Sequence, residues 1–135
     1  MIVKQVPKEL VKQVWSQASG YIESALKYAE DDYSLEQAKD YVLSGKWNLL
    51  VVIDDEHKLR GAITVVYSNY PNYRVAFITA IGGKWISDKE SYSNFCDVLK
   101  ANGATKIQGA ARESVARLWR RLGFREKHII VERAI

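Results

Sequence analysis

Three apolar runs separated by short turns restrict the fold of this chain more than any other feature. The runs are residues 47–53, 59–67 and 73–81, and all three are rich in β-branched and aromatic side chains, which is typical of strands. The connecting residues, 54–58 and 69–72, are turn-forming and too few for a crossover. We therefore predict an antiparallel meander of three strands.

Weaker patterns precede the meander. Residues 2–6 alternate between apolar and polar side chains, which indicates a first strand. Two apolar stripes at helical spacing follow, and Ser19-Gly20 between them predicts a break into two helices. Ser34 and Gln37 have the spacing of a capping box, so we expect a third short helix that ends at Gly45.

A helix, a strand, a second helix and a last strand are predicted after the meander. Ser87 and Glu90 form a capping box ahead of the first helix. Residues 105–109 form the strand, residues 112–122 the second helix and residues 124–135 the last strand. A strand, a helix and a strand in succession give a parallel pair with a right-handed crossover.

These elements define the predicted fold class. The chain has 135 residues, which is the usual size of one domain, so we predict a single domain over residues 1–135. Its class is α/β with a mixed sheet. An antiparallel meander is followed by a parallel strand pair, and helices cover both faces.

Composition excludes several classes of protein. Cys96 is the only cysteine, so no internal disulfide forms, and the two histidines, His57 and His128, lie far apart in the sequence, which argues against a zinc site. No apolar run approaches the ~18 residues that a membrane helix needs. The first residues lack the pattern of a signal peptide. We therefore expect a cytoplasmic protein that does not enter a membrane.

Positive charge is concentrated in the second part of the chain. The net charge is +4: residues 1–83 hold 9 Lys and Arg against 10 Asp and Glu, and residues 84–135 hold 11 against 6. The basic part fits either a phosphate-bearing ligand or a solvated helix surface. No nucleic-acid recognition motif accompanies it, so we do not expect a nucleic-acid partner.

The stretch FITAIGGKWISDKE, residues 77–90, joins the last meander strand to the next helix through Gly82-Gly83. Glycines at such a junction let backbone N–H groups converge, and a helix start attracts anions, so a phosphate can bind there. The same two glycines can also serve only to turn the chain after a buried strand. The sequence leaves both interpretations open.

Two further stretches carry a resemblance to a known family. RESVARLWRRLGF, residues 112–124, resembles the helix-to-strand motif of the GNAT N-acyltransferases, in which Leu118, Gly123 and Phe124 match. LRGAITV, residues 59–65, is similar to the family's second meander strand. The combination of IGGKW with GAARES and LGF resembles a divergent GNAT branch that tailed bacteriophages encode.

The resemblance implies a cofactor and a place for it. In the family, acetyl-CoA lies where two parallel strands splay, here residues 73–81 and 105–109, and its pyrophosphate binds backbone amides at the following turn. The implied cofactor-binding residues are Ile81, Gly82, Gly83, Lys84, Trp85 and Arg112. The acceptor is a small-molecule or protein amine. The family's usual loop reads Arg/Gln-x-x-Gly-x-Gly/Ala, and Gly82-Gly83-Lys84 does not fit that spacing.

Catalytic residues cannot be assigned from the sequence. Residues 75–81 hold no carboxylate, and Thr79 is a poor substitute for a base. Trp119 stands where the family usually has the tyrosine that acts as the general acid. An indole N–H cannot give up a proton at neutral pH. We expect Trp119 to be a core residue, packed with Leu118, Phe95 and Leu99.

Other polar clusters have two interpretations each. The acidic run Glu30-Asp31-Asp32 either borders the acceptor site, as the resemblance implies, or is a solvated helix end. Tyr67, Tyr70 and Tyr73 either line a pocket or lie on the surface of a hairpin end.

Two functional hypotheses follow. The first is an acetyl-CoA-dependent N-acetyltransferase. The second is a catalytically silent GNAT-fold phage protein that acts by binding a host or virion protein, in the host cytoplasm or in the virion.

Overall fold

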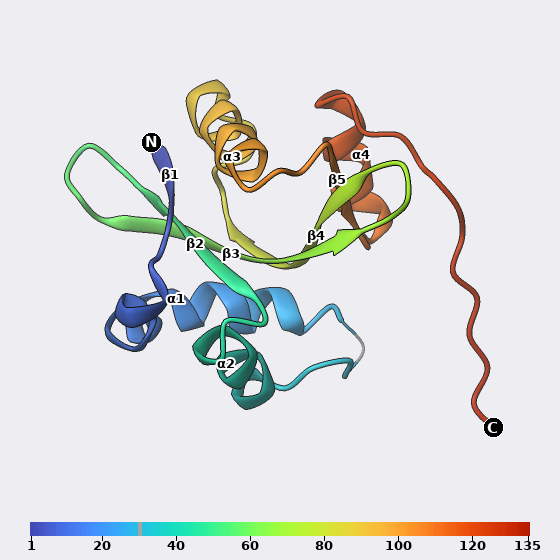
Figure 1. The fold of residues 1–135 in the computed structure, drawn as a ribbon, viewed down its shortest axis with the longest axis horizontal. Helices are drawn as coiled ribbons and strands as arrows, with labels where there is room; N and C mark the ends of the chain where they lie inside the picture. Colours follow the sequence, from blue (N-terminus) through green and yellow to red (C-terminus); the bar gives the residue numbers. More distant parts are fainter. Residues whose placement is uncertain (30) are drawn as a thin grey trace.

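The computed structural model of the protein describes residues 1–29 and 31–135. In chain order its elements are β1 (Ile2–Gln5), the 3-10 helix η1 (Lys8–Leu10), α1 (Val11–Leu26), α2 (Leu35–Leu43), β2 (Asn48–Ile53), β3 (Leu59–Asn69), β4 (Arg74–Gly83), α3 (Lys89–Ala101), β5 (Lys106–Gly109) and α4 (Glu113–Arg121). The strands form one sheet in the order β1-β2-β3-β4-β5, antiparallel except for the parallel β4–β5 pair (Figure 1). This arrangement confirms the predicted α/β class, the meander and the parallel pair.

Helices α1 and α2 cover one face of the sheet, and α3 covers the other (Figure 1). On the α1 side, Val11, Trp15, Ala18, Ile22 and Leu26 are buried at intervals of three or four residues, which places them on one face of α1. They pack with Leu49, Val51, Ala62 and Ala80 of the sheet. The apolar stripe of α1 is therefore the face of the helix that packs on the meander.

The opposite face holds the predicted aromatic core. Phe95 and Leu99 of α3 and Trp119 of α4 are buried in one cluster with Ile78 of β4, as the sequence predicts. Leu118 is only half-buried at the edge of that cluster. Trp119 is therefore buried more deeply between α4 and the sheet than Leu118.

Two boundaries differ from the sequence prediction. Helix α1 continues through Ser19-Gly20 without a break. A glycine inside a helix costs only about 1 kcal/mol, and burial of Ala18 and Ile22 on either side outweighs that cost. Helix α3 is capped by Asp88 rather than Ser87, because the Asp88 carboxylate accepts the Ser91 N–H at 3.0 Å.

The predicted last strand is wrong. Residues 124–135 form no strand, and β5 stays at the edge of the sheet. The Phe124 N–H donates to the Trp119 carbonyl, and Lys127 Nζ donates to the Tyr73 hydroxyl at 2.7 Å. These contacts hold residues 124–127 near β5 without strand pairing, and the end of the chain then runs away from the body of the molecule (Figure 1).

Two classes of feature are missing from the described part of the chain. None of its helices combines the length and the apolar character that crossing a membrane requires. Its His, Cys, Asp and Glu side chains form no group of three that could hold a metal ion.

Candidate functional site

The candidate site begins where β4 and β5 part. The parallel pairing runs from Val75 opposite Lys106 to Ile78 opposite Gly109 and then stops. Strand β4 continues to Gly83, still paired with β3 on its other side. Within the described residues, the edge of β4 that faces β5 therefore has no strand partner beyond Ile78, so its backbone groups there can pair with a ligand.

A β-bulge marks the point of divergence. Thr64 of β3 lies opposite Ala80 and Val65 lies opposite Ile78, so Thr79 is the extra residue. A bulge bends its strand, and here the bend falls at the first residue after the pairing with β5 ends. The bulge thus gives a local physical reason for the two strands to separate.

The Thr79 side chain is already engaged. Its hydroxyl donates to the Thr64 carbonyl at 3.0 Å and lies 2.7 Å from the Thr64 hydroxyl oxygen. Thr64 is fully buried, so these bonds satisfy polar groups inside the protein. Thr79 is consequently a structural part of the bulge and does not supply the missing base.

Gly82 and Gly83 belong to β4 and are required by close packing within the protein. A Cβ on Gly82 would lie 2.3 Å from the carbonyl oxygen of Tyr21 in α1. A Cβ on Gly83 would lie 2.4 Å from the Arg60 carbonyl oxygen, and the backbone there has φ +96°. Both glycines therefore have a structural reason to be glycine, whether or not a ligand approaches them.

Trp85 is a core residue, whereas Lys84 beside it is exposed. The Trp85 ring is buried, and its indole N–H donates to the Gly82 carbonyl at 3.1 Å. A Cβ on Gly61 would lie 2.6 Å from Trp85 Cδ1, so the ring fills the space that this glycine leaves. Only the backbone of Trp85 remains for a ligand, while the Lys84 side chain is free to reach one.

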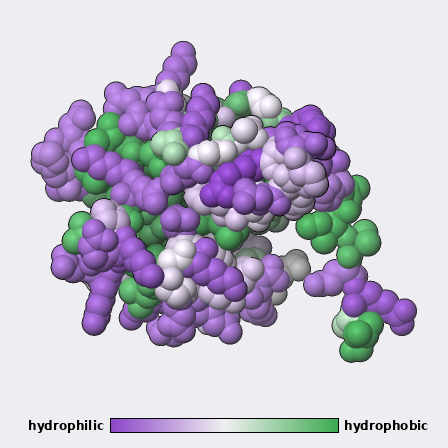
Figure 2. All heavy atoms as spheres, in the orientation of Figure 1, coloured by the Kyte–Doolittle hydropathy of each residue, from purple (hydrophilic) through white to green (hydrophobic). Residues whose placement is uncertain are grey.

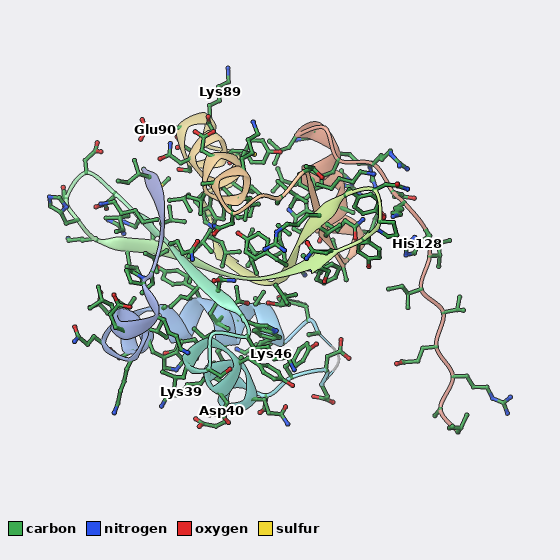
Figure 3. The ribbon with its side chains drawn as sticks, in the orientation of Figure 1. Lys39, Asp40, Lys46, Lys89, Glu90 and His128 are labelled. Atoms are coloured by element: carbon green, nitrogen blue, oxygen red, sulfur yellow. The ribbon has the colours of Figure 1, made fainter. Side chains whose placement is uncertain are left out.

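The start of α3 carries negative charge. Asp88 accepts from Ser91 Oγ at 2.6 Å as well as from the Ser91 N–H. The hydroxyl of Ser91 is the main cause that holds the pKa of Asp88 below its usual range. Glu90 lies in the first turn, and Figure 3 shows it with Lys89 at the outer end of α3. An anion at these helix amides would meet two carboxylates.

Arg112 stands apart from the turn after β4. It occupies the N-cap position of α4 without a side-chain capping hydrogen bond, and its guanidinium carbon lies 3.7 Å from the ring centroid of Tyr28. Tyr28 follows α1, so this cation–π contact joins the segment after β5 to the segment after α1. Of the predicted cofactor-binding residues, Ile81, Gly82, Gly83, Lys84 and Trp85 are contiguous in the chain, whereas Arg112 follows β5 and its side chain contacts Tyr28.

The remaining sequence candidates are dispersed. Asp31 and Asp32 are exposed in the connection between α1 and α2, and Glu30 lies outside the described residues. Tyr67 packs with the α3-side core, where burial raises its pKa, while Tyr70 and Tyr73 stack at 5.1 Å at the hairpin end. The three tyrosines therefore line no common pocket.

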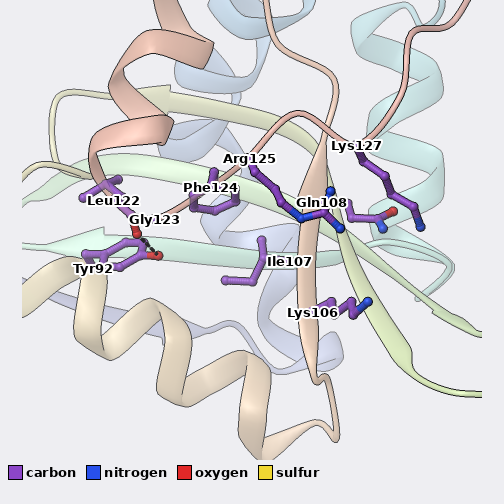
Figure 4. A pocket seen from close by; sticks show the side chains of 9 residues that line it. All are labelled: Tyr92, Lys106, Ile107, Gln108, Leu122, Gly123, Phe124, Arg125 and Lys127. Carbon is purple, nitrogen blue, oxygen red and sulfur yellow. Dashed lines mark hydrogen bonds between the residues drawn. The ribbon is translucent and has the colours of Figure 1, made fainter.

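Two hollows along β5 have no counterpart in the sequence analysis. One, of about 340 Å³, lies between Tyr92 of α3, Ile107 and Phe124, with Lys106, Arg125 and Lys127 around it (Figure 4). The other, of about 360 Å³, lies between Phe77, Gln108, Trp119 and Ile130. The sequence missed them because it placed a strand in this position.

Comparisons with known proteins agree with this geometry. Protein-family models and curated proteins give no match to the sequence. Among solved structures, a probable acetyltransferase matches with TM-score 0.68 and 12% identity, covering 100% of this chain and 97% of that chain. An aminoglycoside acetyltransferase from an uncultured soil metagenomic sample, in complex with sisomicin, matches with TM-score 0.67 and 10% identity, covering 98% and 95%.

A second aminoglycoside acetyltransferase from an uncultured soil metagenomic sample matches with TM-score 0.66 and 13% identity, covering 98% of this chain and 97% of that chain. At such low identity the likeness concerns the fold. The chain therefore has a GNAT-like fold, shared with these acetyltransferases.

Proposed function

We propose that the protein is an acyltransferase of the GNAT type that takes an acetyl group from acetyl-CoA to an amine. The observation that carries the proposal is the free edge of β4 beyond Ile78, opened by the bulge at Thr79. The crevice at the carboxyl ends of parallel strands is a usual place for ligands in sheets of this kind.

The open edge fits the pantetheine arm of acetyl-CoA. The arm is extended and contains two amides, so it can hydrogen-bond to Thr79, Ala80 and Ile81 as an added strand does. When bound, acetyl-CoA supplies the activated acyl thioester. The protein's own part is to hold that arm in line with an incoming amine, because positioning alone removes much of the barrier.

We assign the pyrophosphate to the turn from Gly82 to Trp85, with charge from Lys84 and, across the gap, Arg112. The exposed Lys84 ammonium supports this placement. The first amides of α3 fit an anion less well, because Asp88 occupies that position. The site therefore relies on side-chain cations more than on the helix dipole.

The acceptor in this proposal is a small-molecule or protein amine. The structural likeness to an aminoglycoside acetyltransferase in complex with sisomicin supports a small-molecule amine. Exposed Asp31 and Asp32, near the end of α1, would attract an ammonium group to this side of the sheet. General acid and base remain unassigned.

A second candidate function is favoured by the side chains at the two positions where the family resemblance would place a base and an acid. The Thr79 hydroxyl is bonded to Thr64, and Trp119 is buried against the sheet. A GNAT-fold protein with these features could bind without catalysis, and its partner would be a protein of a host or of a virion.

Release of free CoA thiol from acetyl-CoA in the presence of amines tests the proposal. We expect amine-dependent release, and Lys84→Glu should raise KM for acetyl-CoA at least about tenfold because it opposes the pyrophosphate charge. Lys100→Glu, which makes the same charge change at the far end of α3, should leave KM unchanged. If acetyl-CoA binds but no free CoA is released with any amine tested, the second candidate function is favoured.

A further inference from the structure

The hollow at the start of β5, between α3 and the end of α4, is bordered by three cations. Lys106 is the first residue of β5, and Arg125 and Lys127 belong to the segment after α4 (Figure 4). All three side chains are exposed. Among the described residues, no Asp or Glu lines this hollow, and none forms an ion pair with any of the three cations. The hollow therefore carries positive charge that the chain itself does not neutralise.

Tyr73, at the hairpin end between β3 and β4, holds two of these cations close together. Lys106 Nζ lies 4.0 Å and Lys127 Nζ lies 5.1 Å from the centroid of its ring. Lys127 Nζ also donates to the Tyr73 hydroxyl at 2.7 Å, and this hydrogen bond is the largest cause that holds the pKa of Tyr73 below its usual range. The charges of both ammonium groups lower that pKa further. The same charges would stabilise a bound anion at this place.

The walls of the hollow are apolar. They are formed by half-buried side chains from three elements, namely Tyr92 of α3, Ile107 of β5, and Leu122 and Phe124 at and after the end of α4. Hydrophilic residues, purple in Figure 2, cover most of the layer that contains α3 and α4, so apolar walls are an exception on this layer. The volume of about 340 Å³ is at the lower end of the range for small-molecule pockets. These walls therefore fit a small, flat apolar group.

The hollow is distinct from the gap that we assign to acetyl-CoA. Lys106, at the hollow, pairs with Val75 near the start of β4, whereas the two strands part after Ile78 and Gly109. At a rise of about 3.3 Å per residue, the two ends of β5 lie roughly 10 Å apart. The residues that line the hollow, all within the described part of the chain, include none of the predicted cofactor-binding residues. A ligand in the hollow therefore needs a separate assignment.

Three cations at one opening favour a multiply charged anion. A carboxylate supplies one negative charge, whereas a phosphate monoester carries about −1.5 to −2 charges at pH 7 and offers three acceptor oxygens. Lysine and arginine N–H groups form charge-assisted hydrogen bonds to such oxygens.

We propose that this hollow binds a phosphate monoester of a flat aromatic molecule. The phosphate group lies among Lys106, Arg125 and Lys127, and the aromatic body lies against Ile107 and Phe124. The inference does not depend on acyl transfer, since it uses no residue of the gap between β4 and β5.

Calorimetric titration of the full chain with 1-naphthyl phosphate is the first test, because this molecule joins a phosphate group to a flat aromatic body. We expect saturable binding at one site per chain. 1-Naphthol and inorganic phosphate each lack one half of the probe, so each should bind at least about tenfold more weakly. Absence of binding by 1-naphthyl phosphate overturns the proposal. Equal binding of 1-naphthol or of inorganic phosphate also overturns it, because one half of the proposed contact would then contribute nothing.

Paired substitutions identify the place where the probe binds. Lys106→Gln combined with Arg125→Gln should raise the dissociation constant of 1-naphthyl phosphate at least about tenfold. The matched control is Lys4→Gln combined with Lys12→Gln, which removes two exposed cations on β1 and α1 and should leave binding unchanged. Both double variants should melt with the wild type, because all four side chains are exposed. Binding that the first pair leaves intact, or that falls with Lys84→Glu instead, would place the probe elsewhere and overturn the proposal.

Discussion

Replacing Gly82 with alanine tests whether the double glycine is a packing requirement of the fold. The added Cβ would lie 2.3 Å from the Tyr21 carbonyl oxygen and 2.8 Å from the Tyr21 carbonyl carbon. Both are backbone atoms of α1, so no side-chain rotation relieves the clash, and α1 has to move away from β4. Overpacking of this kind costs typically 1–3 kcal/mol or more.

Urea unfolding followed by tryptophan fluorescence measures that cost. At this chain length, a loss of about 2 kcal/mol lowers the melting temperature by roughly 5–10 °C. Gly20→Ala is the matched control, because the residue lies inside α1 and a Cβ there would meet no atom within 4 Å apart from its chain neighbours and the adjacent backbone of α1. That control should gain about 0.5–1 kcal/mol in stability. Gly82→Ala with the unfolding midpoint of the wild type would refute the packing argument.

Three other substitutions have defined expectations. Trp119→Ala should lower the unfolding free energy by about 3–5 kcal/mol in the same assay, since the ring is buried in the α3-side core, and a wild-type midpoint would contradict that placement. Thr79→Val should cost about 1–3 kcal/mol, because buried Thr64 loses its partner, while Thr79→Ser should restore most of it. The pKa of Asp54 is lowered to about 2, chiefly by the Lys58 backbone N–H and then by Arg60. Because folding lowers the pKa of Asp54, the ionised carboxylate stabilises the folded chain at any pH above the unfolded pKa near 3.8. That stabilisation is lost as the pH falls toward 2. Acid titration of Asp54→Asn should therefore show a weaker loss of stability in this range than wild type.

The sheet could be predicted because its signals are local. Short turns at residues 54–58 and 69–72 allow only antiparallel neighbours, and the helical stripe of Phe95 and Leu99 allows only one inward face. The bulge at Thr79 could not be predicted, because it depends on which β3 residue lies opposite. The same holds for the clash that fixes Gly82, since the clashing atom belongs to a helix some 60 residues earlier in the chain.

The prediction of the last strand was wrong for a different reason. The apolar side chains of residues 124–135 suggest strand character, but a strand forms only against a partner strand, and the local pattern does not show whether the chain supplies one. Arg112 is a similar case. Its contact with Tyr28 joins two segments that follow different elements, and nothing in the local pattern predicts it.

Calorimetric titration of the folded wild-type chain with acetyl-CoA tests the central claim most directly. The account predicts saturable binding at one site per chain, weakened by Lys84→Glu and not by Lys100→Glu. Acetyl-CoA at 100 times its dissociation constant should also add about 2.7 kcal/mol to the unfolding free energy. Absence of heat at millimolar acetyl-CoA, together with an unchanged melting temperature, would contradict the assignment of the gap between β4 and β5 as a cofactor site.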